Sequence, residues 1–255
     1  MKQKIKQLKI KALKKISDLF GASSFFIQGR MDIDPKSLWF DPDFNNHTGG
    51  FTIHNDSINR REVNLPLHDS VRRDMLTLLC RSVAERNISG AIAELGVFQG
   101  QTARLLHYYF PERKLLLFDT FQGFDKRDVE AELETTGLKT TEEHFSNTAV
   151  DSVRKLIQPL NDNIQFIPGY FPSSIQDAEI PSEFAFVHID VDLYQPTLAG
   201  LSYFFPKLSH GGIIVIHDYN AWPGVRKAVE EYCLTQSLIP IPMPDKSGYC
   251  MILKT

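Results

Sequence analysis

Apolar residues along this chain gather into short continuous runs, and segments with helical spacing separate them. The runs fall at 91–97, 114–119, 164–168, 184–190 and 212–217. Runs of this length, rich in Val, Ile, Leu and Phe, are typical of strands buried on both faces of a parallel sheet. Helical patterns occupy 66–88, 101–109, 150–160, 197–208 and 225–235. Strands that alternate with helices predict an α/β fold with a doubly wound, mostly parallel sheet.

The end of the chain departs from this alternation. Two short apolar segments, 239–243 and 248–253, flank the turn sequence Pro-Asp-Lys-Ser. They predict an antiparallel hairpin at one edge, which brings the sheet to seven strands. Residues 124–150 are polar and acidic, and we interpret them as a mobile lid.

The first 65 residues differ in composition from the rest. Residues 1–20 hold seven lysines and one acid, so their net charge is +6. The whole chain has a net charge of −3, so the remaining 235 residues carry −9. Apolar residues at helical spacing predict a basic amphipathic helix. This helix could bind an anionic membrane surface or dock on a partner chain. It could equally pack on its own domain, and both alternatives stay open. Residues 21–65 predict an irregular segment, followed by one α/β domain at 66–255.

Bulk composition excludes several classes of protein. The chain has 255 residues, 42% hydrophobic and 23% charged, as in ordinary soluble domains. No run is long enough to cross a bilayer, and the net charge gives no reason to expect nucleic acid as a partner. The three cysteines, Cys80, Cys233 and Cys250, lack metal-finger spacing, which favours reduced thiols in the cytoplasm.

Acidic side chains concentrate where two of the predicted strands end. Asp190 and Asp192 follow one apolar run, and His217 and Asp218 follow another. Ligands of open α/β sheets bind beyond the carboxyl ends of the strands. Crowded carboxylates there indicate a cation site or a proton-transfer site, because like charges so close together are otherwise costly. Helix capping is the alternative, and three acids with a histidine make it the weaker one.

The first two strands also end in residues suited to a ligand. Glu94, Gly96 and Gly100 form an E-x-G-x-x-x-G turn, in which the glycines allow close approach and the acid suits a cationic group. Asp119 ends the next strand about 20 residues later, where Rossmann-like sheets hold a ribose. Tyr170 follows the third strand and offers a ring that can stack on a base.

With these residues assembled, the chain resembles the macrocin O-methyltransferase (TylF) family of sugar O-methyltransferases over about residues 65–235. The most specific motif is His188-Ile189-Asp190-Val191-Asp192-Leu193-Tyr194. The others are Glu94-Leu95-Gly96-Val97 with Gly100, Phe118-Asp119-Thr120-Phe121-Gln122-Gly123, Gly169-Tyr170-Phe171-Pro172, Gly211-Gly212 leading to Asp218-Tyr219, and Pro223-Gly224-Val225-Arg226-Lys227-Ala228-Val229.

This resemblance implies a seven-stranded class I methyltransferase fold, S-adenosylmethionine as cofactor, a divalent metal and methylation of a sugar hydroxyl. The residues it assigns to the cofactor are Glu94, Gly96, Val97, Phe98, Gly100, Thr102, Asp119, Thr120, Phe121, Gly123, Ser146, Gly169 and Tyr170. It makes Asp192 the general base, and Asp190, His217 and Asp218 the metal ligands. The family usually has two adjacent aspartates where this chain has His217 and Asp218. Mg²⁺ with fewer protein ligands, a softer ion such as Mn²⁺, and no metal all stay open.

Other functions remain as alternatives. One is an O-methyltransferase of a phenolic, catechol-like acceptor, and another is a non-catalytic nucleoside-binding scaffold. The many acids at one sheet edge argue against the scaffold. We expect the protein to form a homo-oligomer. We expect its acceptor to be a sugar-containing small molecule or a glycan. His188 lies within a strand, so we expect it to be buried and hydrogen-bonded.

Overall fold

A computed structural model describes residues 70–255, except residues 159, 177, 244 and 246. The chain divides into two compact units, 1–78 and 79–255. The first unit is described only at residues 70–78, which begin helix α5 (Ser70–Glu85). The basic helix expected at 1–20 and the irregular segment expected at 21–65 lie outside the described residues. The expected domain start at residue 66 also lies outside them and stays a prediction.

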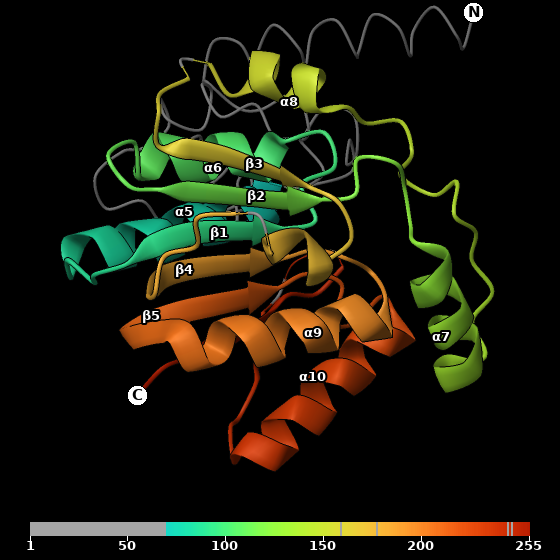
Figure 1. The fold of residues 1–255 in the computed structure, drawn as a ribbon. Coiled ribbons are helices and arrows are strands. Elements are labelled where there is room, and N and C mark those ends of the chain that lie inside the picture. The colour runs from blue at the N-terminus through green and yellow to red at the C-terminus, as the bar shows by residue number, and fades with distance from the viewer. Residues whose placement is uncertain (1–69, 159, 177, 244, 246) are drawn as a thin grey trace, which may run out of the picture. The chain divides into compact units, whose positions relative to one another are not determined.

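The second unit is built on a seven-stranded sheet of order β3-β2-β1-β4-β5-β7-β6. Its strands are β1 (Ala91–Leu95), β2 (Leu115–Asp119), β3 (Ile164–Pro168), β4 (Phe184–Ile189), β5 (Leu208–Ile216), β6 (Ile241–Pro242) and β7 (Cys250–Leu253). Strands β1 to β5 are parallel, and β7 pairs antiparallel with both β5 and β6. The carboxyl ends of the five parallel strands therefore meet at one edge, where the arrowheads lie in Figure 1.

Helices cover both faces of this sheet. They are α6 (Gln101–Tyr109), α7 (Lys126–Thr136), α8 (Val150–Leu156), α9 (Tyr194–Phe204) and α10 (Pro223–Gln236), with 3₁₀ turns η3 (Ser173–Ile175) and η4 (Phe205–Lys207). In Figure 1, α9 and α10 lie in front of the sheet, α6 lies behind it, and α7 stands beyond the arrowheads. Helix α7 packs against α9 and α10.

One apolar cluster joins the strands to α9 and α10. Phe204 of α9 contacts Phe118 of β2 and Phe184 of β4, with ring centroids 5.7 and 5.2 Å apart. All three rings are fully buried. Truncating such a ring to alanine typically costs about 3–5 kcal/mol of stability, so these contacts hold the helical layer against the sheet.

The fold confirms the predicted α/β architecture and the antiparallel pair at its edge, with element ends displaced by a few residues. Residues 124–150, interpreted as a mobile lid, contain helix α7, which the sequence pattern did not predict. That helix has its own start and stop signals. Asp125 caps it through a bond to the Arg127 amide, and Gly137 ends it at a φ of 76°.

Two further expectations from composition can be compared with the structure. Cys80, Cys233 and Cys250 are free and buried. Among the described residues, every helix is too short or too polar to cross a bilayer.

Candidate active site at the carboxyl ends of β4 and β5

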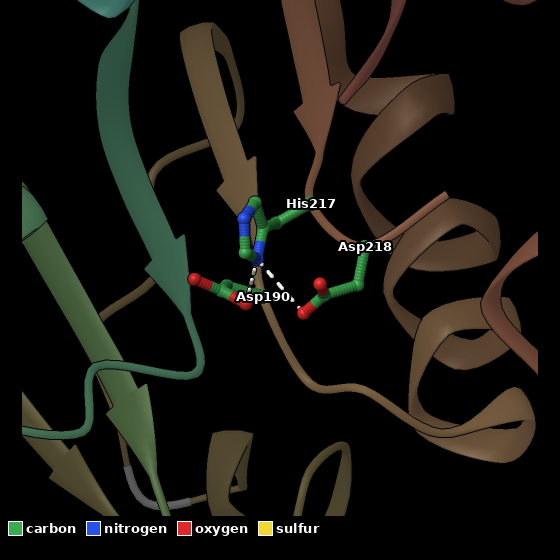
Figure 2. Close-up of side chains that lie close together, drawn as sticks. All are labelled: Asp190, His217 and Asp218. Carbon is green, nitrogen blue, oxygen red and sulfur yellow. Dashed lines mark hydrogen bonds and ion pairs between the residues drawn. The ribbon is translucent and has the colours of Figure 1, made fainter. Parts of the chain in front are cut away.

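Neighbouring strands β4 and β5 bring three ligand-type side chains together. Ile189 ends β4 and pairs with Ile216, which ends β5. The residues that follow, Asp190 on one strand and His217 and Asp218 on the other, therefore emerge side by side. His217 Nδ1 lies 3.0 Å from Asp190 Oδ1 and 2.8 Å from Asp218 Oδ2. Figure 2 shows the imidazole directed between the two carboxylates.

Asp192 lies two residues beyond Asp190 and adds a third carboxylate. Below, the acidic group means Asp190, Asp192, His217 and Asp218. Its side chain is buried, and its backbone has a left-handed φ of 60°. Asp218 is also buried, with a φ of 59°. Burial raises the pKa of Asp192 well above its usual range, and the charges of Asp190 and Asp218 raise it further. The site therefore favours a proton or a positive charge among these carboxylates.

His217 is held from the side of β7. Its ring packs against Tyr249, with centroids 4.6 Å apart, and its Nε2 lies 3.9 Å from Asp245 Oδ2. Asp245 also accepts a hydrogen bond from the Tyr249 amide. These contacts leave Nδ1 directed toward Asp190 and Asp218. A carboxylate beside the second ring nitrogen is the usual support for a histidine that binds a metal.

A buried polar chain runs beneath this group. Glu94 pairs with His188 across β1 and β4, and a 3.1 Å contact joins Glu94 Oε1 to His188 Nδ1. The hydroxyl of Tyr249 forms a 2.6 Å hydrogen bond with His188 Nε2. All three side chains are 0–1% exposed. His188 is thus buried and hydrogen-bonded as expected, while the prediction that Glu94 binds a ligand's amino group stays a prediction.

The loop after β1 is closely tied to the end of β2. Asp119 Oδ2 accepts hydrogen bonds from the amides of Val97 and Phe98 at 2.7 and 2.8 Å, and its Oδ1 accepts from Phe121 at 2.6 Å. Asp119 therefore shapes the turn in which the predicted cofactor residues lie. A ribose contact through its remaining lone pairs stays a prediction.

Gly96 lies where β1 meets the Asp190 loop. Its φ is 89°, and a Cβ there would come within 1.8 Å of the Asp190 carbonyl oxygen. The Asp190 amide donates to the Leu95 carbonyl at 2.8 Å, so the two loops lie backbone to backbone. Only glycine fits between them.

The structure also places the other predicted cofactor residues around these turns. Thr120 Oγ1 donates to the Gly123 carbonyl at 2.6 Å, and the Gly169 amide donates to the Asp119 carbonyl at 2.9 Å. Gly100 precedes α6 at a φ of 84°, Thr102 is buried in that helix, and Ser146 is exposed. Their predicted contacts with a cofactor stay predictions.

Tyr170 is engaged by α7. Its hydroxyl donates to Asp128 at 3.1 Å, and the Arg127 guanidinium lies 3.5 Å from its ring centroid. Burial raises the pKa of Asp128 to about 6 and that of Tyr170 to about 12. The prediction that this ring stacks on a base stays a prediction.

Aromatic side chains from four loops gather at the same edge of the sheet, which the sequence pattern does not predict. Phe124 contacts Phe145 and Trp222, and Phe98 contacts Phe145, with centroids 5.2–6.1 Å apart. The Trp222 amide donates to the Asp218 carbonyl, which joins this cluster to the acidic group. Isolated aromatics in loops carry no periodic signal, so only the fold could bring them together.

The acidic group fits a divalent cation. Ligand atoms of Asp190, His217 and Asp218 all lie within 4.8 Å of one another. Two carboxylate oxygens and one imidazole nitrogen form a donor set that suits Mn²⁺ or another transition metal better than it suits Mg²⁺. The three predicted ligands are thus brought together, while the metal itself stays a prediction.

Comparison with known proteins identifies the family. The chain is 30% identical over 171 residues to a mycinamicin III 3''-O-methyltransferase of Micromonospora griseorubida, a match that covers 59% of this chain and 63% of that protein. It is 27% identical over 171 residues to 8-demethyl-8-(2,3-dimethoxy-alpha-L-rhamnosyl)-tetracenomycin-C 4'-O-methyltransferase of Streptomyces olivaceus, covering 63% and 64%. The chain thus spans less than two thirds of the length of these curated relatives.

A solved structure of the O-methyltransferase NovP has the same fold. It aligns with a TM-score of 0.61 at 22% identity, over 74% of this chain and 83% of that one. The family model for macrocin-O-methyltransferase (TylF) matches residues 57–251, which include strands β1 to β6, the start of β7 and the acidic group. The chain therefore belongs to the macrocin-O-methyltransferase (TylF) family.

Proposed function

We propose that this protein is an S-adenosylmethionine-dependent O-methyltransferase that methylates a sugar hydroxyl with the help of a divalent cation. The observation that carries the proposal is the convergence of Asp190, Asp192, His217 and Asp218 at the carboxyl ends of adjacent strands, next to the glycine turn after β1. Family membership supports the same reaction.

The half of the site that binds the methyl donor, here called the donor half, would be formed by the turns after β1, β2 and β3. Gly96 lets the turn after β1 pack directly on the Asp190 loop, and Asp119 holds the amides of Val97 and Phe98 in one conformation. The turn is therefore preorganised, so little ordering free energy is spent when a cofactor binds.

The acceptor half would activate and orient a hydroxyl. A sugar hydroxyl is a weak nucleophile near neutral pH because it holds its proton tightly. Asp192 is a buried carboxylate beside Asp218 and Asp190, and we assign it as the general base that takes this proton. The rigid backbone link between the Asp190 loop and Gly96 would keep acceptor and donor aligned for in-line transfer.

The cation would be held by Asp190, His217 and Asp218, whose ligand atoms form one cluster. When bound, it supplies Lewis acidity that stabilises negative charge on the acceptor oxygen. Asp245 and Tyr249 would keep the His217 ring in place for this role. Mg²⁺ and Mn²⁺ are the two candidates, and the nitrogen ligand favours Mn²⁺.

The proposed acceptor is a sugar carried on a small molecule or a glycan. The relatives' names support this class, since one of them specifies a rhamnosyl substituent. A phenolic acceptor that chelates the cation through two oxygens is the second candidate. Cytoplasmic location, a homo-oligomer and membrane contact through residues 1–20 stay predictions.

Calorimetry with S-adenosylmethionine and S-adenosylhomocysteine is the first test of the proposal. We expect both to bind the full-length protein, with a competent acceptor then found by a methyl-transfer assay on a panel of nucleotide sugars, glycolipids and catechols. Binding of neither nucleoside would overturn the proposal. Transfer to catechols and to no sugar would favour the second candidate.

A further inference from the structure

Helix α7 contains a carboxylate that is completely enclosed. The side chain of Glu132 is 0% exposed, and among the described residues it forms no ion pair with a basic side chain. Burial of a charged group is costly unless hydrogen bonds or dipoles replace its water shell. Its position therefore requires specific partners.

Those partners are a hydroxyl and the first turns of two helices. Glu132 Oε1 accepts a hydrogen bond from Thr136 Oγ1 at 2.9 Å, and Oε2 accepts one from the Tyr194 amide at 2.8 Å. Tyr194 is the first residue of α9. On the other side, a Cβ at Gly224, in the first turn of α10, would meet Oε2 at 2.0 Å and Oε1 at 2.5 Å. The carboxylate is thus seated directly against the backbone of α10.

Both helix starts favour a negative charge. The first amides of a helix lack partners inside it, and its N-terminus carries partial positive charge. One carboxylate placed between two such ends is stabilised by both of them. Glu132 therefore joins α9, α10 and α7 at one point.

Each of these helix starts directly follows one of the acidic loops. Asp192 lies two residues before Tyr194. Asp218 accepts hydrogen bonds through its carbonyl from the amides of Ala221 and Trp222, the latter preceding α10. The relative position of the two helix starts is therefore transmitted to Asp192 and Asp218 through only a few residues of chain.

We propose that Glu132 is a positioning residue that sets the spacing between the Asp192 and Asp218 loops by clamping the first turns of α9 and α10. Its effect on catalysis rests on the proposed methyltransferase function, while the clamp itself can be tested without turnover. Glu132 does not touch the reacting atoms in this assignment. It acts through the two helices.

The test uses full-length protein with four variants, Glu132→Gln, Glu132→Ala, Gly224→Ala and the double variant Glu132→Ala with Gly224→Ala. Glu134→Gln, an exposed position on the same helix, is the matched control. The first readout is amide hydrogen exchange at residues 190–194 and 217–225. The second is affinity for S-adenosylhomocysteine, and the third is kcat and KM with the acceptor found above.

We expect Glu132→Ala to speed exchange in both loops roughly tenfold or more, as loss of one well-placed hydrogen bond allows. Affinity for S-adenosylhomocysteine should stay within about threefold, because the donor half lies on other strands. The kcat should fall about 100-fold with a smaller change in KM, as for a misplaced catalytic group. The exchange rates and the kcat of Glu132→Gln should lie between those of the parent and those of Glu132→Ala, since an amide oxygen can still accept the hydrogen bond from the Tyr194 amide.

The double variant distinguishes a clamp from general destabilisation. Gly224→Ala alone should behave like Glu132→Ala, because its methyl group meets the carboxylate. With the carboxylate removed the methyl group has room, so the two changes should be strongly non-additive. Additive effects, exchange that rises evenly over the whole sheet, or an unchanged kcat in Glu132→Ala would each overturn the proposal. If the parent transfers no methyl group while Glu132→Ala still shows the loop-specific rise in exchange, the methyltransferase function fails and the clamp stands.

Discussion

At the residue scale, His217 brings a nitrogen ligand into a group whose other members are carboxylates. The Tyr249 ring and Asp245 hold its imidazole so that Nδ1 points toward Asp190 and Asp218. A carboxylate at this position would offer a harder ligand and add a negative charge. In the proposed metal site, the choice of ion therefore depends on this one side chain more than on any other.

This dependence gives a prediction about metal preference. Chelator-treated protein should lose turnover and regain it more efficiently with Mn²⁺ than with Mg²⁺. The His217→Asp variant should shift the preference toward Mg²⁺, since that ion prefers oxygen ligands. Calorimetric titration of both ions into both proteins measures the shift independently of activity. Turnover that is insensitive to chelator would contradict the assignment of a metal.

Asp192 gives a second prediction at this scale. The Asp192→Asn variant keeps the shape of the side chain and removes its ability to take a proton. We expect kcat to fall about 10²–10⁴-fold, the usual contribution of a general base, with unchanged affinity for S-adenosylhomocysteine. Asp162→Asn, in an exposed turn before β3, is the matched control. A near-normal rate in the Asp192→Asn variant would remove Asp192 as the base.

The grouping of Asp190, His217 and Asp218 could be predicted from sequence because parallel strands end at one edge. The pairing of Glu94 with His188 could not, since it depends on the register between β1 and β4. The same holds for Asp119, whose carboxylate binds backbone amides that any residue type would provide. Such contacts leave no signature in side-chain chemistry.

At the scale of elements, apolar runs predicted the strands well because a central parallel strand has no polar face. Helix α7 was missed for the opposite reason. Its residues are mostly polar, and two acids, Asp128 and Glu132, are the ones that it buries. A pattern of apolar positions cannot reveal a helix whose inward face is charged. Its capping residues, Asp125 and Gly137, were the available signal.

The buried acid Asp128 predicts how stability depends on pH. Burial raises its pKa from 3.8 to about 6, an effect opposed by the Tyr170 hydrogen bond and Arg127 and reinforced by Asp125. The folded state thus binds the proton more tightly than the unfolded state. The stability that this provides is fully present below about pH 4 and is lost as the pH rises through about 6.

The Asp128→Asn variant should remove this contribution while keeping an acceptor for the Tyr170 hydroxyl. Relative to the parent, its free energy of unfolding should rise by about 2–3 kcal/mol at pH 7.5 and change little at pH 4. Urea titrations at both pH values measure the difference. Glu130→Gln, also on α7, is the control, and a gain of the same size at both pH values would contradict burial of the Asp128 charge as the cause.

At the scale of the whole molecule, residues 79–255 share one apolar core that extends from β3 to β7. The strands near both edges of the sheet therefore depend on the same core. Cys80, Cys233 and Cys250 are all buried, at 0%, 3% and 0% exposure, and burial raises their pKa values. Thiols of this kind are shielded and protonated. Their reaction therefore requires that the structure open.

Thiol labelling should thus report unfolding of the molecule. In native conditions we expect all three thiols to react with a disulfide reagent far more slowly than a free thiol, and at one common rate if the unit opens cooperatively. In denaturant three thiols should react at once. Rapid labelling of one thiol in the native protein would show that its part of the core opens independently.

The left-handed backbone at Asp192 and Asp218 has a consequence for the balance between stability and activity. Side-chain-bearing residues pay roughly 1–2 kcal/mol for this conformation, and glycine adopts it freely. Replacing Asp192 with glycine would also relieve repulsion among three carboxylates. Such a protein should melt at a higher temperature and lose at least the roughly 10²–10⁴-fold in kcat expected for removal of the proposed base. Glycine at these two positions would therefore stabilise the fold, and it would remove two carboxylates that the proposed reaction uses.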